Sequence, residues 1–271
     1  RLRSNETKTY SIKLSDNLYQ IDAFAGAQQR NYKVKRFICA TAKEALSAMI
    51  QGLDGVSKVD SAYDTAIQAA KASAIKALRD QLKEYALICD AVREALPEDG
   101  IFVRDITMSG STWGSRLLPI YAPNRNIHSL AGAIGLGLAH GIGAAIANPD
   151  KKVISLVGDG GLMLGIGEIA TMFQEQTNMV LLVMNDGGYG VMRVIQNNYF
   201  DGRQYFNELH TPSYRALGES MGVPSFEADS VESFREAIEK AVKIEGPALV
   251  EVLMNEIGPL NFAGPPQRKL Y

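Results

Sequence analysis

Residues 151–193 constrain the fold more than any other part of the chain. Residues 153–157 form a short apolar, β-branched run followed by glycines, which predicts a buried strand that ends in a tight turn. A helical apolar pattern covers residues 164–176, and a second apolar run covers residues 179–184. The unit is therefore strand, helix and parallel strand, and the right-handed crossover rule places both strand ends at one edge of a sheet.

Each of these two strands is followed by glycines and an aspartate. Asp159 comes directly after Gly158, and Asp186 follows the second apolar run. Because both strands end at the same edge, we expect the two carboxyl groups to lie close together. Carboxylate oxygens suit a hard cation such as Mg²⁺, which completes its shell with water and phosphate oxygens, and glycines let backbone N–H groups approach an anion. The pattern predicts a magnesium-diphosphate site, with the alternative that each aspartate only caps a turn.

The two turns resemble the cofactor signature of thiamine-diphosphate-dependent enzymes, the family of acetolactate synthase and benzoylformate decarboxylase. The signature consists of Gly158-Asp159-Gly160 and the closing pair Asn185-Asp186. The resemblance implies that Mg²⁺ is bound by Asp159, Asp186 and the backbone carbonyl of Gly188. It also implies contacts to the cofactor from these turns, at Gly158, Asp159, Gly160, Gly161, Leu162, Asp186, Tyr189 and Gly190.

Two positions depart from the family pattern. Asp186 stands where the family usually has Asn, which keeps an oxygen ligand and adds a negative charge. Gly161 stands where many relatives have Ser, so one hydroxyl contact to the diphosphate is lost while the backbone N–H remains. We expect metal binding to survive both changes.

The small residues in most of the segment 128–147 predict a buried helix packed closely on a sheet, and the beginning of the segment resembles the family's glycine-rich turn over the aminopyrimidine ring. By the resemblance, the carbonyl of Gly132 accepts a hydrogen bond from the 4′-amino group of the cofactor. The same comparison makes Ile134 the bulky apolar side chain that bends the cofactor into its V shape.

A dinucleotide site is the main alternative interpretation of the same stretch. Gly165, Gly167 and Ala170 match the pattern G-x-G-x-x-A, and Asp186 follows about 20 residues later at the end of the next strand. In a dinucleotide-binding fold, however, the first glycine directly follows the strand, and Gly165 comes several residues after it. A dinucleotide-binding oxidoreductase therefore stays a minor alternative.

Composition excludes several classes of protein. The 271 residues are 46% hydrophobic, enough for a sizeable core, and the net charge of -2 gives no basic surface for nucleic acid or an acidic membrane. No apolar run reaches membrane-spanning length. Cys39 and Cys89 lie far apart without metal-ligand spacing, which indicates apolar packing in a reducing compartment. We expect a cytoplasmic protein.

The fold class predicted from these patterns is α/β, with an open, mainly parallel sheet and helices on both faces. Further strands are expected at residues 101–103, 226 and 248–253, and further helices at residues 214–221 and 231–242. Aromatic and polar residues at 191–207 resemble a mobile segment beside the active site, and are equally typical of a surface connection. The Pro- and Gly-rich tail after Gly258 is expected to be a lid or disordered.

The first 55 residues are expected to be the remnant of a second α/β domain. Their predicted elements, three short strands and one helix, are residues 10–14, 18–21, 37–39 and 43–53. They bury too little to stand alone, and they resemble the end of the middle domain of acetolactate-synthase-like enzymes. We expect a helical linker at residues 56–80 and a diphosphate- and metal-binding domain at residues 81–271.

The resemblance implies processing of a 2-oxo acid by decarboxylation and carboligation, as in acetolactate synthase. A simple 2-oxo acid decarboxylase, an aldehyde lyase and a non-catalytic cofactor-binding fragment are alternatives. Ile195 stands where acetolactate synthases usually have Trp, which leaves the substrate open. In such enzymes the Glu that activates the cofactor lies in the pyrimidine-binding domain of a neighbouring subunit. No segment here resembles that domain, so we expect it, and a homo-oligomer, as partners.

No catalytic residue is assigned from the sequence. Histidine is the usual group for proton transfer near neutral pH, and His128, four residues before Gly132, is the one weak candidate. His140 and His210 fit structural or solvent-exposed roles.

Overall fold

The computed structural model describes residues 11–30, 32–55, 60–130 and 132–260, which form two compact units. The division falls inside the long helix α2 (Ser61–Leu82), between Ala72 and Ser73. The domain limits expected from the sequence stay a prediction. No helix in the described ranges combines the length and apolar character that crossing a membrane requires.

The smaller unit contains two short parallel strands, β1 (Tyr19–Asp22) and β2 (Arg36–Cys39), with a 3-10 turn η1 (Ala25–Ala27) between them. Helix α1 (Ala42–Leu53) follows. The third strand expected at residues 10–14 is wrong for residues 11–14, which form a turn, a bend and irregular chain. A strand needs a neighbour for its backbone hydrogen bonds, and in the described part of this unit β1 pairs with β2 alone.

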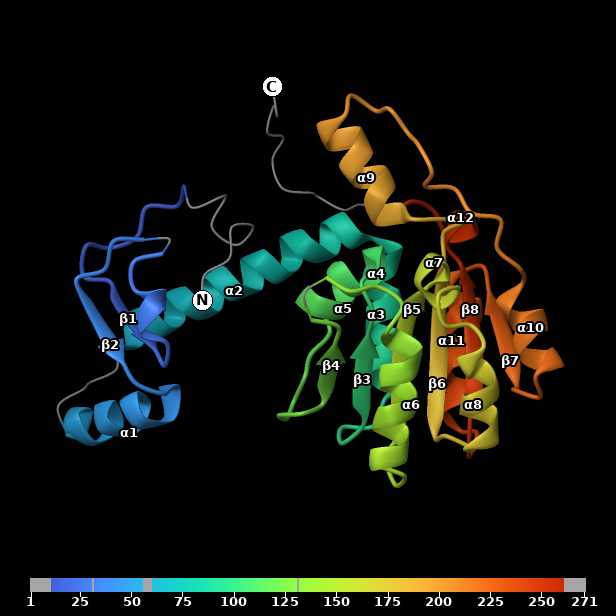
Figure 1. Ribbon diagram of the computed structural model, residues 1–271, viewed down its shortest axis with the longest axis horizontal. Helices are drawn as coiled ribbons and strands as arrows, with labels where there is room; N and C mark the ends of the chain where they lie inside the picture. The colour runs from blue at the N-terminus through green and yellow to red at the C-terminus, as the bar shows by residue number, and fades with distance from the viewer. Residues whose placement is uncertain (1–10, 31, 56–59, 131, 261–271) are drawn as a thin grey trace. The chain divides into compact units, whose positions relative to one another are not determined.

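Six parallel strands form the sheet of the larger unit, in the order β4-β3-β5-β6-β8-β7 (Figure 1). Their bounds are β3 (Ile101–Arg104), β4 (Asn126–His128), β5 (Val153–Gly158), β6 (Met179–Asn185), β7 (Ser225–Ala228) and β8 (Ala248–Leu253). Because all six run in the same direction, all their carboxyl ends lie at one edge. The predicted fold class is confirmed.

Helices cover both faces of this sheet, which is why its central strands are apolar without alternation. On one face, α3 (Glu84–Ala95) and α11 (Val231–Val242) pack on side chains such as Ile154 and Val250. On the other, α6 (Gly137–Ala147), α8 (Glu168–Gln174) and α10 (Tyr214–Ser220) pack on side chains such as Val153 and Leu181.

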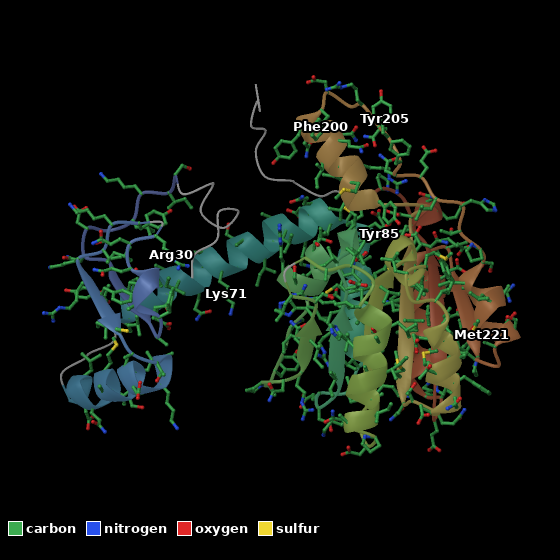
Figure 2. The ribbon with its side chains drawn as sticks, in the orientation of Figure 1. Arg30, Lys71, Tyr85, Phe200, Tyr205 and Met221 are labelled. Carbon is green, nitrogen blue, oxygen red and sulfur yellow. The ribbon has the colours of Figure 1, made fainter. Side chains whose placement is uncertain are left out.

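Short helices lie at the carboxyl edge, where the strands end. They are α4 (Met108–Ser111), α5 (Trp113–Arg116), α7 (Asp159–Leu162), α9 (Gly190–Tyr199) and α12 (Met254–Ile257). Tyr85, labelled on α3 in Figure 2, ties α3 to this edge, because its hydroxyl donates a 2.8 Å hydrogen bond to the carbonyl of Gly258. The edge is therefore built from loops and short helices that the core supports.

Three segments differ from the sequence prediction in length or type. The helix within residues 128–147 begins only at Gly137, because Gly132 and Gly135 adopt φ angles of +77° and +81°, which a right-handed helix cannot contain. The helix expected from Leu164 begins at Glu168. The loop expected at residues 191–207 is wrong over α9, and beyond it Tyr205, labelled in Figure 2, is 64% exposed. The tail prediction lies largely outside the described residues.

Candidate active site

Asp159 and Asp186 meet at the carboxyl edge of the sheet, as the strand-helix-strand pattern predicts. Gly158 at the end of β5 lies opposite Met184 on β6, so the residues just beyond these two strands are neighbours. Asp159 is the first residue of α7, and Asp186 directly follows β6. The pairing register of β5 and β6 therefore brings together two acidic residues that directly follow these strands.

The environment of this pair raises the pKa of both carboxyl groups. Burial, and then the negative charge of Asp186, raise the pKa of Asp159 to about 6, against a smaller opposing effect of backbone N–H donors such as that of Gly160. Burial also raises the pKa of Asp186, while Arg193 acts in the opposite direction. Asp159 is only 1% exposed, and its Oδ2 has no hydrogen-bond partner among the described residues. Such a buried, unpartnered oxygen is available to a cation.

Arg193 and Gly190, both on α9, fix the position of Asp186. The Arg193 guanidinium forms a 3.0 Å ion pair with Oδ2 of Asp186 and donates a 2.8 Å hydrogen bond to its backbone carbonyl. Gly190 leaves room for the same carboxylate, since a Cβ at this position would collide with Oδ2 of Asp186. The start of α9 is thus shaped around this carboxylate.

A cavity of about 340 Å³ opens beside the two aspartates. The predicted site residues that line it are Gly132, Ile134, Gly158, Asp159, Gly160, Gly161, Asp186, Gly188, Tyr189 and Gly190. Leu162 is the exception, because its side chain packs in the hydrophobic core with residues such as Val157. The structure therefore gathers the candidate residues around one space, while their contacts with a ligand stay a prediction.

Several lining residues were not among the site residues selected from the sequence. They are Ile106, Thr107, Met108, Ser109, Met184, Val191, Met192 and Met254. Most of them follow the ends of β3, β6 or β8, so the rule that ligands bind beyond the carboxyl ends of parallel strands points to them. Ser109 is fully buried, and its hydroxyl has no partner in the described ranges.

Asp105 joins the glycine-rich turn to the sheet, although it is not among the site residues selected from the sequence. It is fully buried, and its Oδ2 accepts hydrogen bonds from the backbone N–H groups of Gly135 at 2.8 Å and Gly137 at 3.1 Å. Its Oδ1 accepts from the N–H of Ile106 at 2.7 Å. The turn that carries Gly132 and Ile134 is therefore anchored at the end of β3.

The histidines lie away from this space. His128 ends β4, where it pairs with Arg104 of β3, His140 lies in α6, and His210 is exposed. No histidine occurs among the described residues that line the cavity. The placement gives no support to His128 as a catalytic residue.

The donor set fits Mg²⁺ with a diphosphate better than a cation held by protein alone. Across the described ranges, no three His, Cys, Asp or Glu side chains are arranged to hold a metal ion. The site offers two carboxylates and backbone carbonyls, and Mg²⁺ commonly keeps waters and substrate phosphates in its remaining positions. The glycines beside Asp159 leave the cavity open to such an anion.

The dinucleotide alternative has no comparable site. Gly165 and Gly167 come after α7 rather than directly after β5, and neither lines the cavity. Asp186, the candidate ribose ligand in that interpretation, lies beside Asp159 and pairs with Arg193. The geometry disfavours this alternative.

Comparison with known proteins agrees with the geometry. Residues 105–252, just over half of the chain, match the family model described as "Thiamine pyrophosphate enzyme, C-terminal TPP binding domain". The chain is 27% identical to the acetolactate synthase isozyme 1 large subunit of Escherichia coli over 178 residues, 64% of this chain and 31% of that protein. It is also 27% identical to the benzoylformate decarboxylase of Pseudomonas aeruginosa over 177 residues, 64% of this chain and 32% of that protein.

A third relative is a probable acetolactate synthase large subunit of Methanococcus aeolicus, 30% identical over 140 residues, 51% of this chain and 23% of that protein. In all three comparisons the chain spans less than a third of the relative's length.

Proposed function

Because the chain belongs to the thiamine pyrophosphate enzyme family, through its C-terminal cofactor-binding domain, we propose that it holds thiamine diphosphate together with Mg²⁺ at the carboxyl edge of its sheet. The observation that carries this proposal is the buried pair of Asp159 and Asp186 beside a glycine-lined cavity. Asp159, Asp186 and the carbonyl of Gly188 would hold the cation.

The remaining candidate residues form two groups, which would contact different parts of the cofactor from two sides of the cavity. The glycines at 158, 160, 161 and 190, with Tyr189, would contact the diphosphate side, and Leu162 would do so through its backbone, since its side chain packs in the core. Gly132 and Ile134 would contact the aminopyrimidine side, where Asp105 anchors their turn. Methionines in the lining, among them Met108 and Met254, would keep water from the reacting end.

The reaction that we propose is decarboxylation of a 2-oxo acid followed by carboligation, as in acetolactate synthase. When bound, thiamine diphosphate supplies the electron sink for loss of carbon dioxide, and the protein supplies orientation and electrostatics. Sequence identity does not favour one relative, since it is 27% to both the synthase and the decarboxylase. A 2-oxo acid decarboxylase, an aldehyde lyase and a cofactor-binding piece without activity are the alternatives.

We also propose a pyrimidine-binding domain of a neighbouring subunit as the partner of this site, within a homo-oligomer. Two apolar side chains at the cavity support this, since Ile134 is 42% exposed and Met192 is 43% exposed. Exposed apolar side chains around a site are typical of an interaction surface.

Titration calorimetry tests the cofactor assignment. Thiamine diphosphate should bind in the presence of Mg²⁺ and bind much more weakly in EDTA, because a diphosphate without the cation would face two like charges. Asp159→Ala should resemble the EDTA condition. Equal binding with and without metal would contradict the proposal, and binding of NADH in the same assay would revive the dinucleotide alternative.

A further inference from the structure

Glu251 is a buried carboxylate in the middle of the sheet and outside the cavity lining. It lies on β8 between Val183 of β6 and Glu227 of β7, and it is 1% exposed. A buried charge is tolerated only where hydrogen bonds replace water. Three donors do so here, and none of them belongs to the cavity lining: the side chain of Asn185, the backbone N–H of Arg215 and the hydroxyl of Ser213.

The first of these bonds leads directly to the proposed cation site. Nδ2 of Asn185 donates to Oε1 of Glu251 at 2.9 Å, and Oδ1 of Asn185 accepts from the backbone N–H of Gly187 at 3.1 Å. Both ends of the Asn185 side chain are therefore held, one by the sheet and one by the turn that follows. Asp186 and Gly188, two of the three proposed ligands, lie on that turn.

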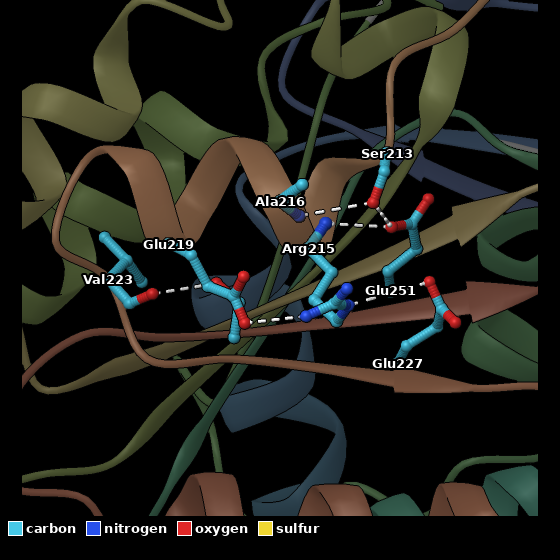
Figure 3. Close-up of polar contacts among 8 residues, drawn as sticks. Ser213, Arg215, Ala216, Glu219, Val223, Glu227 and Glu251 are labelled. Carbon is cyan, nitrogen blue, oxygen red and sulfur yellow. Dashed lines mark hydrogen bonds and ion pairs between the residues drawn. The ribbon is translucent and has the colours of Figure 1, made fainter.

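The other two bonds attach the beginning of α10 to the same carboxylate. Oε2 of Glu251 accepts from the N–H of Arg215 at 2.8 Å and from the hydroxyl of Ser213 at 3.4 Å (Figure 3). Between them, Tyr214 is fully buried and its hydroxyl donates a 3.0 Å bond to the backbone carbonyl of Asp159. The segment 213–215 thus contacts both Glu251 and the turn that carries Asp159, the third proposed ligand.

We propose that Glu251 is a positioning residue for the cation site: through Asn185 and the start of α10, it fixes the two turns that carry Asp159, Asp186 and Gly188. The inference rests on the proposed function, because it concerns the affinity of that site for Mg²⁺ with thiamine diphosphate. Glu251 needs both of its oxygens as acceptors, since Oε1 and Oε2 have different donors. A glutamine has only one such oxygen.

Glu251→Gln is the test, and Glu227→Gln is its matched control. Glu227 lies directly opposite Glu251 on the neighbouring strand, and its carboxylate lies 3.9 Å from the side chain of Arg215 rather than against a turn of the site. Figure 3 shows both carboxylates beside Arg215. In calorimetry on the full chain with thiamine diphosphate, we expect Glu251→Gln to weaken Mg²⁺ binding by about 10- to 100-fold. Glu227→Gln should change it by less than about twofold.

A second readout separates positioning from general loss of structure. The backbone amide resonances of Gly187 and Gly188 should shift in Glu251→Gln and stay in place in Glu227→Gln, while circular dichroism and the melting temperature report on folding. A folded Glu251→Gln with unchanged Mg²⁺ affinity overturns the inference. If that variant does not fold, Asn185→Ala decides, because it breaks the link to the turn and leaves Glu251 bonded to α10; unchanged Mg²⁺ affinity in that variant also overturns it.

The outcomes distinguish this inference from the proposed function. If the unmodified chain shows no Mg²⁺-dependent binding of thiamine diphosphate, the proposed function and this inference both fail. If the unmodified chain binds and Glu251→Gln binds equally well, only the positioning role of Glu251 fails.

Discussion

Arg193 pairs with Asp186 twice, through a 3.0 Å ion pair with its carboxylate and a 2.8 Å hydrogen bond to its backbone carbonyl. Asp159 has no such cation beside it, and its Oδ2 has no partner among the described residues. The two carboxyl groups of the site are therefore not equivalent. Burial raises the pKa of both groups, but Arg193 opposes this rise only at Asp186, and the charge of Asp186 adds to the rise at Asp159, whose pKa is raised to about 6.

The first prediction concerns the pH dependence of Mg²⁺ binding. The cation requires the charged form of Asp159, whose pKa in the metal-free protein is raised to about 6. Binding should therefore be complete above about pH 7 and weaken roughly tenfold for each pH unit below 6. Calorimetry between pH 5 and pH 8, in buffers of different ionisation enthalpy, would detect the proton released on binding. A flat profile over that range would contradict the assignment.

The second prediction is that Asp159→Asn stabilises the metal-free protein. A carboxyl whose pKa is raised by folding binds more protons in the folded than in the unfolded state, so stability falls as pH rises from about 4 to 6. Asparagine removes this penalty, and at pH 7 the gain should be on the order of 2 to 3 kcal/mol. Urea unfolding in EDTA would measure it. The gain should shrink as the pH falls to 4, and an Asp159→Asn protein less stable than the parent at pH 7 would refute the argument.

The third prediction is that two substitutions at the ion pair move the pH profile in opposite directions. Asp186→Asn removes the negative charge that raises the pKa of Asp159, so the midpoint for Mg²⁺ binding should shift to lower pH. Arg193→Gln removes the cation that lowers the pKa of Asp186. In this variant the midpoint for Mg²⁺ binding should therefore shift to higher pH. The same calorimetric titration serves for both variants. Shifts of the same sign would show that charge coupling does not govern the site.

The carboxylate pair could be predicted from the sequence because its placement depends on local patterns. Short apolar runs fix β5 and β6, the crossover rule fixes their direction, and the glycines that follow leave little freedom in the turns. The positions of Asp159 and Asp186 then follow from backbone register. Their roles as ligands follow only from the family resemblance and stay a prediction.

Asp105 and Glu251 could not be predicted as structural anchors, because their partners are distant in sequence. Asp105 bonds to Gly135, and Glu251 bonds to Asn185 and Arg215, contacts that exist only once the sheet and helices have assembled. In the sequence each is a single acid at the end of an apolar run or inside one. The length of α6 was missed for a related reason, since small residues favour close packing of a helix as well as a left-handed turn.

The fourth prediction uses Asp105 to separate the two sides of the cavity. Asp105→Asn puts a donor where the Gly135 or Ile106 N–H needs an acceptor, which should destabilise the protein by about 1 to 3 kcal/mol. Because the anchored turn carries Gly132 and Ile134, thiamine diphosphate should bind more weakly while inorganic pyrophosphate with Mg²⁺ binds as before. Competition calorimetry with both ligands would measure this.

Asp80→Asn is the control for this substitution, since the Asp80 side chain is 64% exposed and pairs with Lys76 on the surface of α2. It should leave both ligands unaffected. Equal weakening of pyrophosphate and thiamine diphosphate in Asp105→Asn would mean that the whole site, rather than its aminopyrimidine side, depends on Asp105.

The last prediction concerns turnover by these 271 residues alone. The titratable groups that line the described cavity are Asp159, Asp186 and Tyr189, and the first two are proposed to hold the cation. No carboxyl group among the described lining residues is left to exchange a proton with the aminopyrimidine, and the family resemblance gives that task to a Glu of the pyrimidine-binding domain. We therefore expect thiamine diphosphate to bind without consumption of pyruvate. Adding a pyrimidine-binding domain from an acetolactate synthase to the purified chain should restore turnover, and the same domain with its activating Glu replaced by Gln should not. Intact mass spectrometry would exclude a longer contaminant, and robust turnover by the chain alone would place the proton-transfer group within it.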